Sequence, residues 1–188
     1  MRAKFLMIPL ATLSLAGCAV APLSAPQPSL DNIQAIRAGG LPPMAVGDFV
    51  PGPGRPTDMD KTIAARGGID SAPEGSFAKY LADTLSAELK GAGKLDPNAT
   101  LTVTGVITDT KLTSEIGTPT AKLSAQFTLT RNGRQVFQKE LSVSDTWDWQ
   151  YLADVAVPDA FNHYAGLFPK LVGVLLSDPD FKAAAKGG

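Results

Sequence analysis

Residues 99–146 alternate apolar and polar side chains over a long stretch, and this period of two constrains the fold more than any other feature. Such alternation places one row of side chains on each face of a β-strand. The polar positions are mostly Thr, Ser, Gln and Lys, which predicts a sheet with one buried face and one solvated face. The apolar rows are Leu101, Val103, Gly105 and Ile107, then Leu123, Ala125, Phe127 and Leu129, then Phe137, Leu141 and Val143.

The connections between these rows predict how the strands pair. Asn132-Gly133 separates the second row from the third and is typical of a type I′ hairpin turn. Strands joined by short turns pair antiparallel. A shorter alternation over residues 41–50 predicts a first strand, whereas residues 51–75 show no period and are expected to form a long loop.

Two helices are predicted around this sheet. Residues 77–89 carry apolar side chains at spacings of three and four, with Ser76 as the N-cap and Gly91 or Gly93 at the end. A second helix is expected to close the chain, with Pro158 in its first turn and a kink or break at Pro169. The predicted fold class is therefore α+β: a mostly antiparallel sheet of three to four strands with two helices packed on one face, in the order β-α-β-β-β-α.

The N-terminus has the three parts of a secretory signal peptide. Arg2 and Lys4 supply positive charge, an apolar run follows, and small residues precede Cys18. The apolar run is much shorter than the roughly 20 residues that a membrane-spanning helix needs. The sequence therefore predicts a cleaved signal peptide over residues 1–17, which would leave Cys18 as the first residue of the mature chain.

Leu15, Ala16, Gly17 and Cys18 resemble the lipobox of bacterial lipoproteins. The resemblance implies that Cys18 is acylated and anchors the protein to a membrane. It also implies the outer membrane, facing the periplasm, rather than the inner membrane, because Ala19 stands where an Asp commonly retains lipoproteins at the inner membrane. Two or three acyl chains give a stable anchor, whereas one chain is marginal.

The rest of the chain is expected to form a tether and one domain. Residues 18–40 begin with Pro, Ala and Ser, which predicts a flexible tether behind the lipidated cysteine. Residues 41–188 are expected to form a single α+β domain. Residues 41–182 resemble small periplasmic lipoproteins, the YajG-like group and the auxiliary lipoproteins of ABC-type lipid transporters. Four segments carry this resemblance: Asp48-Phe49-Val50, Phe77–Leu89, "TVTGVI" and "LLSDPDF". It implies a binding or assembly module rather than an enzyme.

Composition excludes several classes of function. The net charge is −1 and no basic run occurs, so nucleic acid is not an expected partner. Acylation would block the only cysteine, Cys18, and His163 is the only histidine, which leaves too few ligands for a usual zinc site. Gly105 and Gly117 are too isolated for a phosphate loop. No cofactor and no metal are predicted.

Trp147, Trp149 and Tyr151 form the most distinctive candidate surface. In an extended chain they point to one side, because strand side chains alternate. Three readings remain open: the edge of the core, a binding surface for a protein or lipid partner, or a platform for a sugar ring.

An alternative function rests on carboxylates. Asp145 and Asp148 lie beside the tryptophans, with Asp154 and Asp159 shortly after, and a carboxylate pair near aromatic rings can form a glycosidase cleft. The alternative is thus an envelope glycan hydrolase using Asp145 and Asp148, although the same residues also suit a solvated turn and a helix N-terminus. Asp58 and Asp60 could touch a cation, but they lack the spacing of an EF-hand loop.

Overall fold

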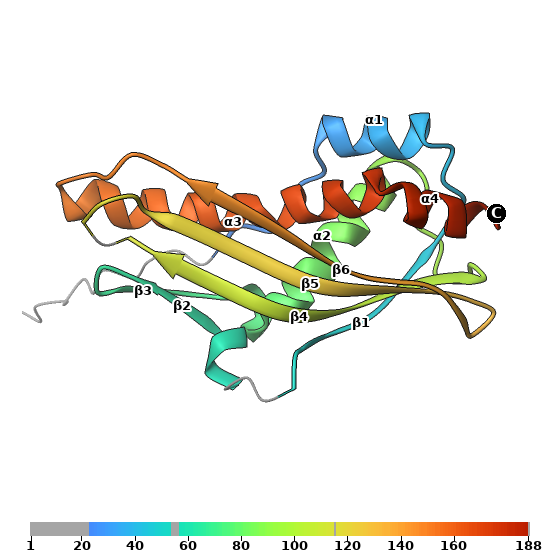
Figure 1. Ribbon diagram of the computed structural model, residues 1–188, viewed down its shortest axis with the longest axis horizontal. Coiled ribbons are helices and arrows are strands. Elements are labelled where there is room, and N and C mark those ends of the chain that lie inside the picture. Colours follow the sequence, from blue (N-terminus) through green and yellow to red (C-terminus); the bar gives the residue numbers. More distant parts are fainter. Residues whose placement is uncertain (1–22, 54–56, 115, 188) are drawn as a thin grey trace, which may run out of the picture.

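A computed structural model describes residues 23–53, 57–114 and 116–187 of the chain (Figure 1). The predicted signal peptide and Cys18 therefore lie outside the described residues. The helices are α1 (Leu30–Ala38), α2 (Phe77–Gly91), α3 (Ala153–Ser177) and α4 (Pro179–Lys186), with short 3₁₀ turns η1 (Thr57–Asp60) and η2 (Pro73–Gly75). The strands are β1 (Ala45–Pro51), β2 (Thr62–Ala65), β3 (Gly68–Ser71), β4 (Leu101–Thr113), β5 (Thr120–Arg131) and β6 (Arg134–Thr146).

The main sheet has the strand order β1-β4-β5-β6, and its last three strands are the antiparallel strands that the alternation predicts. The turn between β5 and β6 has φ of 51° at Asn132 and 78° at Gly133, as a type I′ turn requires. The sheet is nevertheless mixed, because β1 pairs parallel with β4. A strand that returns through a helix arrives in the parallel direction, and α2 is that crossover.

The segment 51–75 corrects the prediction of a long loop. Strands β2 and β3 form an antiparallel hairpin, which is a second sheet of two strands. The hairpin packs on α3: Ala65 joins Ala160 and Phe161 in a small buried cluster, and partly buried Val157 packs against it. The sequence did not indicate this hairpin because its strands are too short to show a clear alternation of apolar and polar residues. Contacts with α3 bury its apolar side chains, which an isolated two-stranded hairpin cannot do by itself.

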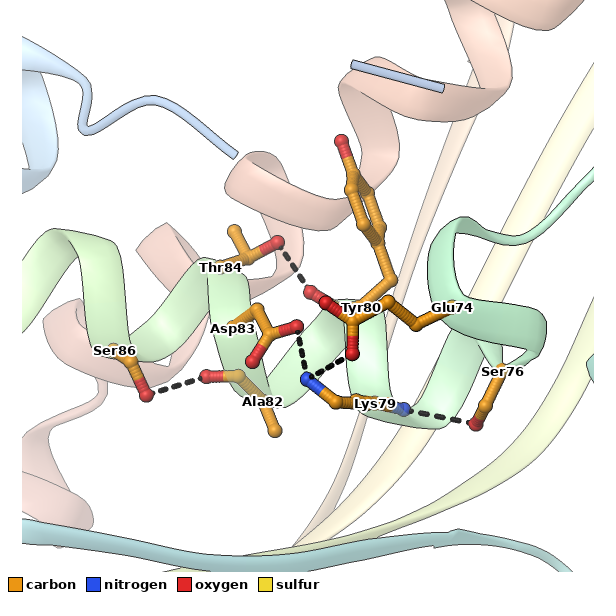
Figure 2. A network of polar contacts seen from close by, with 8 residues as sticks. All are labelled: Glu74, Ser76, Lys79, Tyr80, Ala82, Asp83, Thr84 and Ser86. Carbon is orange, nitrogen blue, oxygen red and sulfur yellow. Dashed lines mark hydrogen bonds and ion pairs between the residues drawn. The ribbon is translucent and has the colours of Figure 1, made fainter. Parts of the chain in front are cut away.

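Helix α2 follows its prediction closely. Ser76 is the N-cap and its hydroxyl accepts a hydrogen bond from the Lys79 amide at 3.0 Å (Figure 2). On the exposed face, the Lys79 ammonium bridges Asp83 at 2.8 Å and Glu74 at 3.1 Å. The Tyr80 ring points away from this charged group (Figure 2). The apolar face of α2, including Leu81 and Leu85, is fully buried.

Helix α3 begins at Ala153, which corrects the prediction that Pro158 lies in its first turn. The missing N–H of Pro158 would have bonded the carbonyl of Asp154, an exposed residue, so water can satisfy that group. The helix also continues through Pro169 without a break. Its broad apolar face holds it against the rest of the core, with Phe168 and Leu171 fully buried.

The described ranges form four α-helices rather than the two predicted. Helices α2 and α3 contact the sheet, α1 contacts α2 and α3, and α4 contacts β5 and β6 (Figure 1). Helix α1 lies within the range predicted as tether, yet Ile36 is fully buried. The ordered domain thus begins before residue 41. Among the described ranges, the structure holds no helix whose length and apolar run suffice to cross a membrane.

Candidate functional site

The predicted aromatic and acidic residues at 145–151 lie at one end of the molecule, where the turn of the β2–β3 hairpin meets the connection from β6 to α3 (left in Figure 1). The Arg66 guanidinium, in the hairpin turn, donates to the carbonyl of Gln150 at 2.7 Å and that of Tyr151 at 3.4 Å. The connection from β4 to β5 also contacts this segment, because the Trp147 amide donates to the carbonyl of Pro119 at 3.4 Å. Two loops distant in sequence therefore fix the path of residues 147–151.

Asp145 and His163 form the central polar contact of this end. Nδ1 of His163 donates to the Asp145 carboxylate at 2.8 Å, while Nε2 lies 3.7 Å from Asp159. The indole of Trp147 stacks on the imidazole, with 4.2 Å between ring centroids and 5° between planes. Both ring nitrogens of His163 thus face carboxylates, and Trp147 covers one face of the ring.

This arrangement does not suit Asp145 to the role of the acid in a glycosidase. The hydrogen bond from His163 lowers the pKa of Asp145 below its usual range, with a smaller contribution from the Thr146 amide. A glycosidase acid needs a raised pKa so that it holds its proton at neutral pH. The two carboxylates also approach His163 at opposite nitrogens, so the three groups do not converge on one metal ion.

A shallow depression of about 280 Å³ opens beside this pair. Both polar and apolar residues line it, and one of them, Lys170, donates from its ammonium to the carbonyl of Ser144 at 2.8 Å. Asp148 is exposed and does not line it. The depression therefore holds one of the two carboxylates that the hydrolase alternative requires. Its lining residues are Asp145, Asp159, Asn162, His163, Gly166, Leu167 and Lys170.

The aromatic residues have three different environments. Trp147 is partly buried and packs on the core. Trp149 lies under the Arg66 guanidinium, 5.3 Å from its ring centroid, and meets Tyr151 edge to face at 6.0 Å. Its indole Nε1 is buried and has no hydrogen-bond partner among the described residues. Tyr151 is 78% exposed, so it is the one of the three that is fully available to a partner.

The acidic residues of the 51–75 segment have a structural use. Asp60 accepts a hydrogen bond from the Ala78 amide at 2.9 Å, at the N-terminus of α2. Helix N-termini favour carboxylates because their first amides lack partners. The side chain of Asp58 falls outside the described residues.

Sequence reasoning missed the residues that complete this end. Arg66 lies far from Gln150 in sequence, and no local pattern indicates their contact. Leu152, the N-cap of α3, and Val155, in its first turn, are 63% and 51% exposed, and no local pattern distinguishes them from core residues. Together with Tyr151 they form an exposed apolar group, which we call the entry surface of α3.

The Asp145–His163 pair predicts a dependence of stability on pH. Because the pKa of Asp145 is lowered on folding, the charged carboxylate stabilises the fold above its usual pKa, and this contribution is lost as the pH falls through the lowered value. Asp145→Asn should therefore destabilise the protein at pH 6 by at most about 1 kcal/mol, since the pair is partly exposed. The difference between wild type and variant should shrink below about pH 4.

Urea unfolding followed by tryptophan fluorescence at several pH values measures this difference. Asp148→Asn is the matched control, because Asp148 is exposed and outside the depression. A difference for Asp145→Asn that stays constant from pH 6 to pH 3 would show that the pair does not act through its charge.

The sheet topology and the helix packing define a class of small α+β domains. In this class a crossover helix and a long closing helix cover one face of a mixed four-stranded sheet. No protein-family model matches the sequence, and no curated protein matches it significantly. The chain is similar in structure to a crystal structure of a DUF330 protein from Xanthomonas campestris, with 13% identity and a TM-score of 0.53. The match covers 84% of this chain and 94% of that one, so the two share a fold.

Two further structures are more distant. A minor lipoprotein from Acinetobacter baumannii has 9% identity and a TM-score of 0.43, over 75% of this chain and 94% of that one. The dodecameric PelC from Paraburkholderia phytofirmans has 14% identity and a TM-score of 0.40, over 81% and 90%. Scores at this level do not establish a common fold.

Proposed function

We propose that this protein is a lipid-anchored lipoprotein of the bacterial cell envelope that acts as a non-catalytic binding module. The anchor is Cys18, and the domain faces the periplasm from the outer membrane. The lipobox Leu15-Ala16-Gly17-Cys18 supports the anchor, and the entry surface of α3 supports the binding role.

The entry surface is the observation that carries the binding role. Tyr151, Leu152 and Val155 each expose more than half of their surface, although a folded chain of this size has a core that could bury them. The backbone beneath them is fixed by Arg66, which reduces the entropy lost when a partner binds. An exposed apolar group on a fixed backbone is typical of an interaction surface.

The hydrolase alternative gains no support from the site. Asp145 is engaged by His163 and its pKa is lowered, which is the wrong direction for a general acid. Asp148 lies outside the depression that Asp145 lines. We therefore propose the binding module alone.

Cells that express the protein and are grown with a clickable fatty acid test the anchor. We expect wild type to carry the label and to sediment with outer membranes, and Cys18→Ala to lose the label completely and to leave the membrane fraction. Thr12→Ala, in the same N-terminal segment, is the matched control and should behave as wild type. Equal labelling of wild type and Cys18→Ala, or of neither, would overturn the proposal.

A further inference from the structure

A further hollow, of about 610 Å³, lies at the end of the molecule opposite the entry surface. It is formed between the β5–β6 turn and the end of α4, both at the right in Figure 1. Arg131 and Arg134 line it, together with the side chains of Asn132 and Gln135, and none of the described residues that line it is acidic. The hollow is therefore positively charged, although the whole chain has a net charge of −1.

Arg131 is fixed in this hollow by the C-terminus of α4. Its Nη2 group donates to the carbonyls of Ala184 and Ala185 at 2.9 and 3.0 Å. The last carbonyls of a helix lack partners within the helix and favour a nearby cation, so this contact accounts for Arg131 without any ligand. The two bonds use both hydrogens of Nη2, and the other three N–H groups of the guanidinium remain for a further acceptor.

No such contact accounts for Arg134. It lies directly opposite Arg131 in the β5–β6 ladder, so the two side chains project from the same face of the hairpin, where like charges destabilise the pairing. Arg134 is exposed, and within the described part of the chain its side chain forms neither an ion pair nor a hydrogen bond. Asp178 and Asp180, at the other end of α4, both pair with Lys139 instead. An anion bound between the two guanidinium groups would offset their repulsion.

The side chains and the volume of the hollow suit a phosphate ester. Arginine recognises phosphate through parallel N–H groups that match two of its oxygens, and the unpaired Arg134 can make such a bidentate contact. The side-chain amides of Asn132 and Gln135 supply neutral N–H donors for further oxygens. A volume of about 610 Å³ is within the range of small-molecule sites, so the hollow also has room for the group that the phosphate esterifies.

We infer that this hollow binds a phosphate ester, with Arg134 as the bidentate donor and Arg131 as the second cation. The inference goes beyond the proposed anchor and the entry surface and rests on neither of them, because it concerns the opposite end of the domain. The phosphate of a soluble ester and that of a lipid headgroup share this chemistry, and the experiment below distinguishes the two sources.

NMR of the purified, ¹⁵N-labelled protein in a nonionic detergent tests the inference. Glycerol 3-phosphate should shift the backbone amides of residues 131–136 and 184–187, and the shifts should saturate. Arg134→Gln should weaken binding by about tenfold or more, because it removes a charge-assisted bidentate contact. The variant should keep the fold, since Arg134 has no partner among the described residues. Arg134→Lys keeps the charge but not the planar guanidinium, so its affinity should be intermediate.

Lys111→Gln is the matched control, because it removes the same charge from an exposed residue far from the hollow. Arg131 pairs with Leu101, and Lys111 follows Leu101 by ten positions on β4, or about 33 Å at 3.3 Å per residue. This variant should bind glycerol 3-phosphate as wild type does.

The outcomes identify the source of the phosphate or overturn the inference. Saturable shifts with glycerol 3-phosphate assign the hollow to a soluble ester, whereas shifts only with short-chain phosphatidylglycerol in the micelles assign it to a lipid headgroup. Shifts that sodium chloride reproduces at equal ionic strength, or that persist unchanged in Arg134→Gln, would overturn the inference. It would also fail if neither phosphate compound produced saturable shifts at these residues.

Discussion

Replacing Phe168 by alanine is expected to lower the free energy of unfolding by about 3–5 kcal/mol. Phe168 is fully buried where α2 meets α3, and its ring contacts those of Phe77, Tyr80 and Tyr164 at centroid distances of 6.1, 4.8 and 5.5 Å. The variant loses both the transfer free energy of the ring and the packing of its three neighbours, because the cavity can collapse only partly.

Equilibrium unfolding in urea, followed by tryptophan fluorescence, measures this loss. Val174→Ala is the matched control on the same helix: Val174 is 40% exposed, and its truncation should change stability by no more than about 0.5 kcal/mol. A loss below about 1 kcal/mol for Phe168→Ala would contradict the packing of α2 on α3, since such a value is typical of a site outside the core.

The second large effect is expected at Glu88, which is fully buried and fastens α1 to the domain. Its carboxylate accepts hydrogen bonds from the Ser29 amide and, at 2.8 Å, from the side-chain amide of Asn32. In Glu88→Ala the partly buried Ser29 amide and the buried side-chain amide of Asn32 both lose this acceptor, and an unsatisfied buried donor costs about 1–3 kcal/mol. We expect α1 to detach, with fast hydrogen exchange over residues 29–38.

The conservative variant distinguishes the hydrogen bonds from the volume of the side chain. Glu88→Gln keeps one oxygen acceptor and should show intermediate exchange, whereas Glu140→Ala, on the open face of the sheet, should leave α1 protected. Strands β4 and β5 should keep their protection in all three variants, because α1 packs mainly on α2 and α3. Unchanged exchange in Glu88→Ala would show that apolar contacts such as those of Ile36 suffice to hold α1.

The elements that follow from the sequence have local causes. Strands β4, β5 and β6 were predictable because their side chains alternate, and the β5–β6 turn because Asn132-Gly133 accepts positive φ. The α2 boundaries were predictable because Ser76 is an N-cap beside a regular apolar period. Each signal lies within a few residues of the structure that it predicts.

The candidate site was predictable only in its location. The sequence placed aromatic and acidic residues near 145–151, but it could not show that Trp147 stacks on His163 or that Trp149 lies under Arg66. It also assigned Asp145 and Asp148 to one possible cleft, whereas only Asp145 lines the depression. Contacts between side chains on different elements depend on how those elements pack, which no local pattern records.

The sequence by itself determined the antiparallel strands, the boundaries of α2 and the presence of a long closing helix, because short-range periodicity and capping specify them. Only the tertiary structure decided the rest. The bond from Ser29 to Glu88 joins residues 59 positions apart and makes part of the predicted tether a packed helix. The bond from Arg66 to Gln150 joins residues 84 positions apart and fixes the entry surface. Such contacts form only after the core has brought the elements together, so their position in the fold cannot be obtained from the order of residues along the chain.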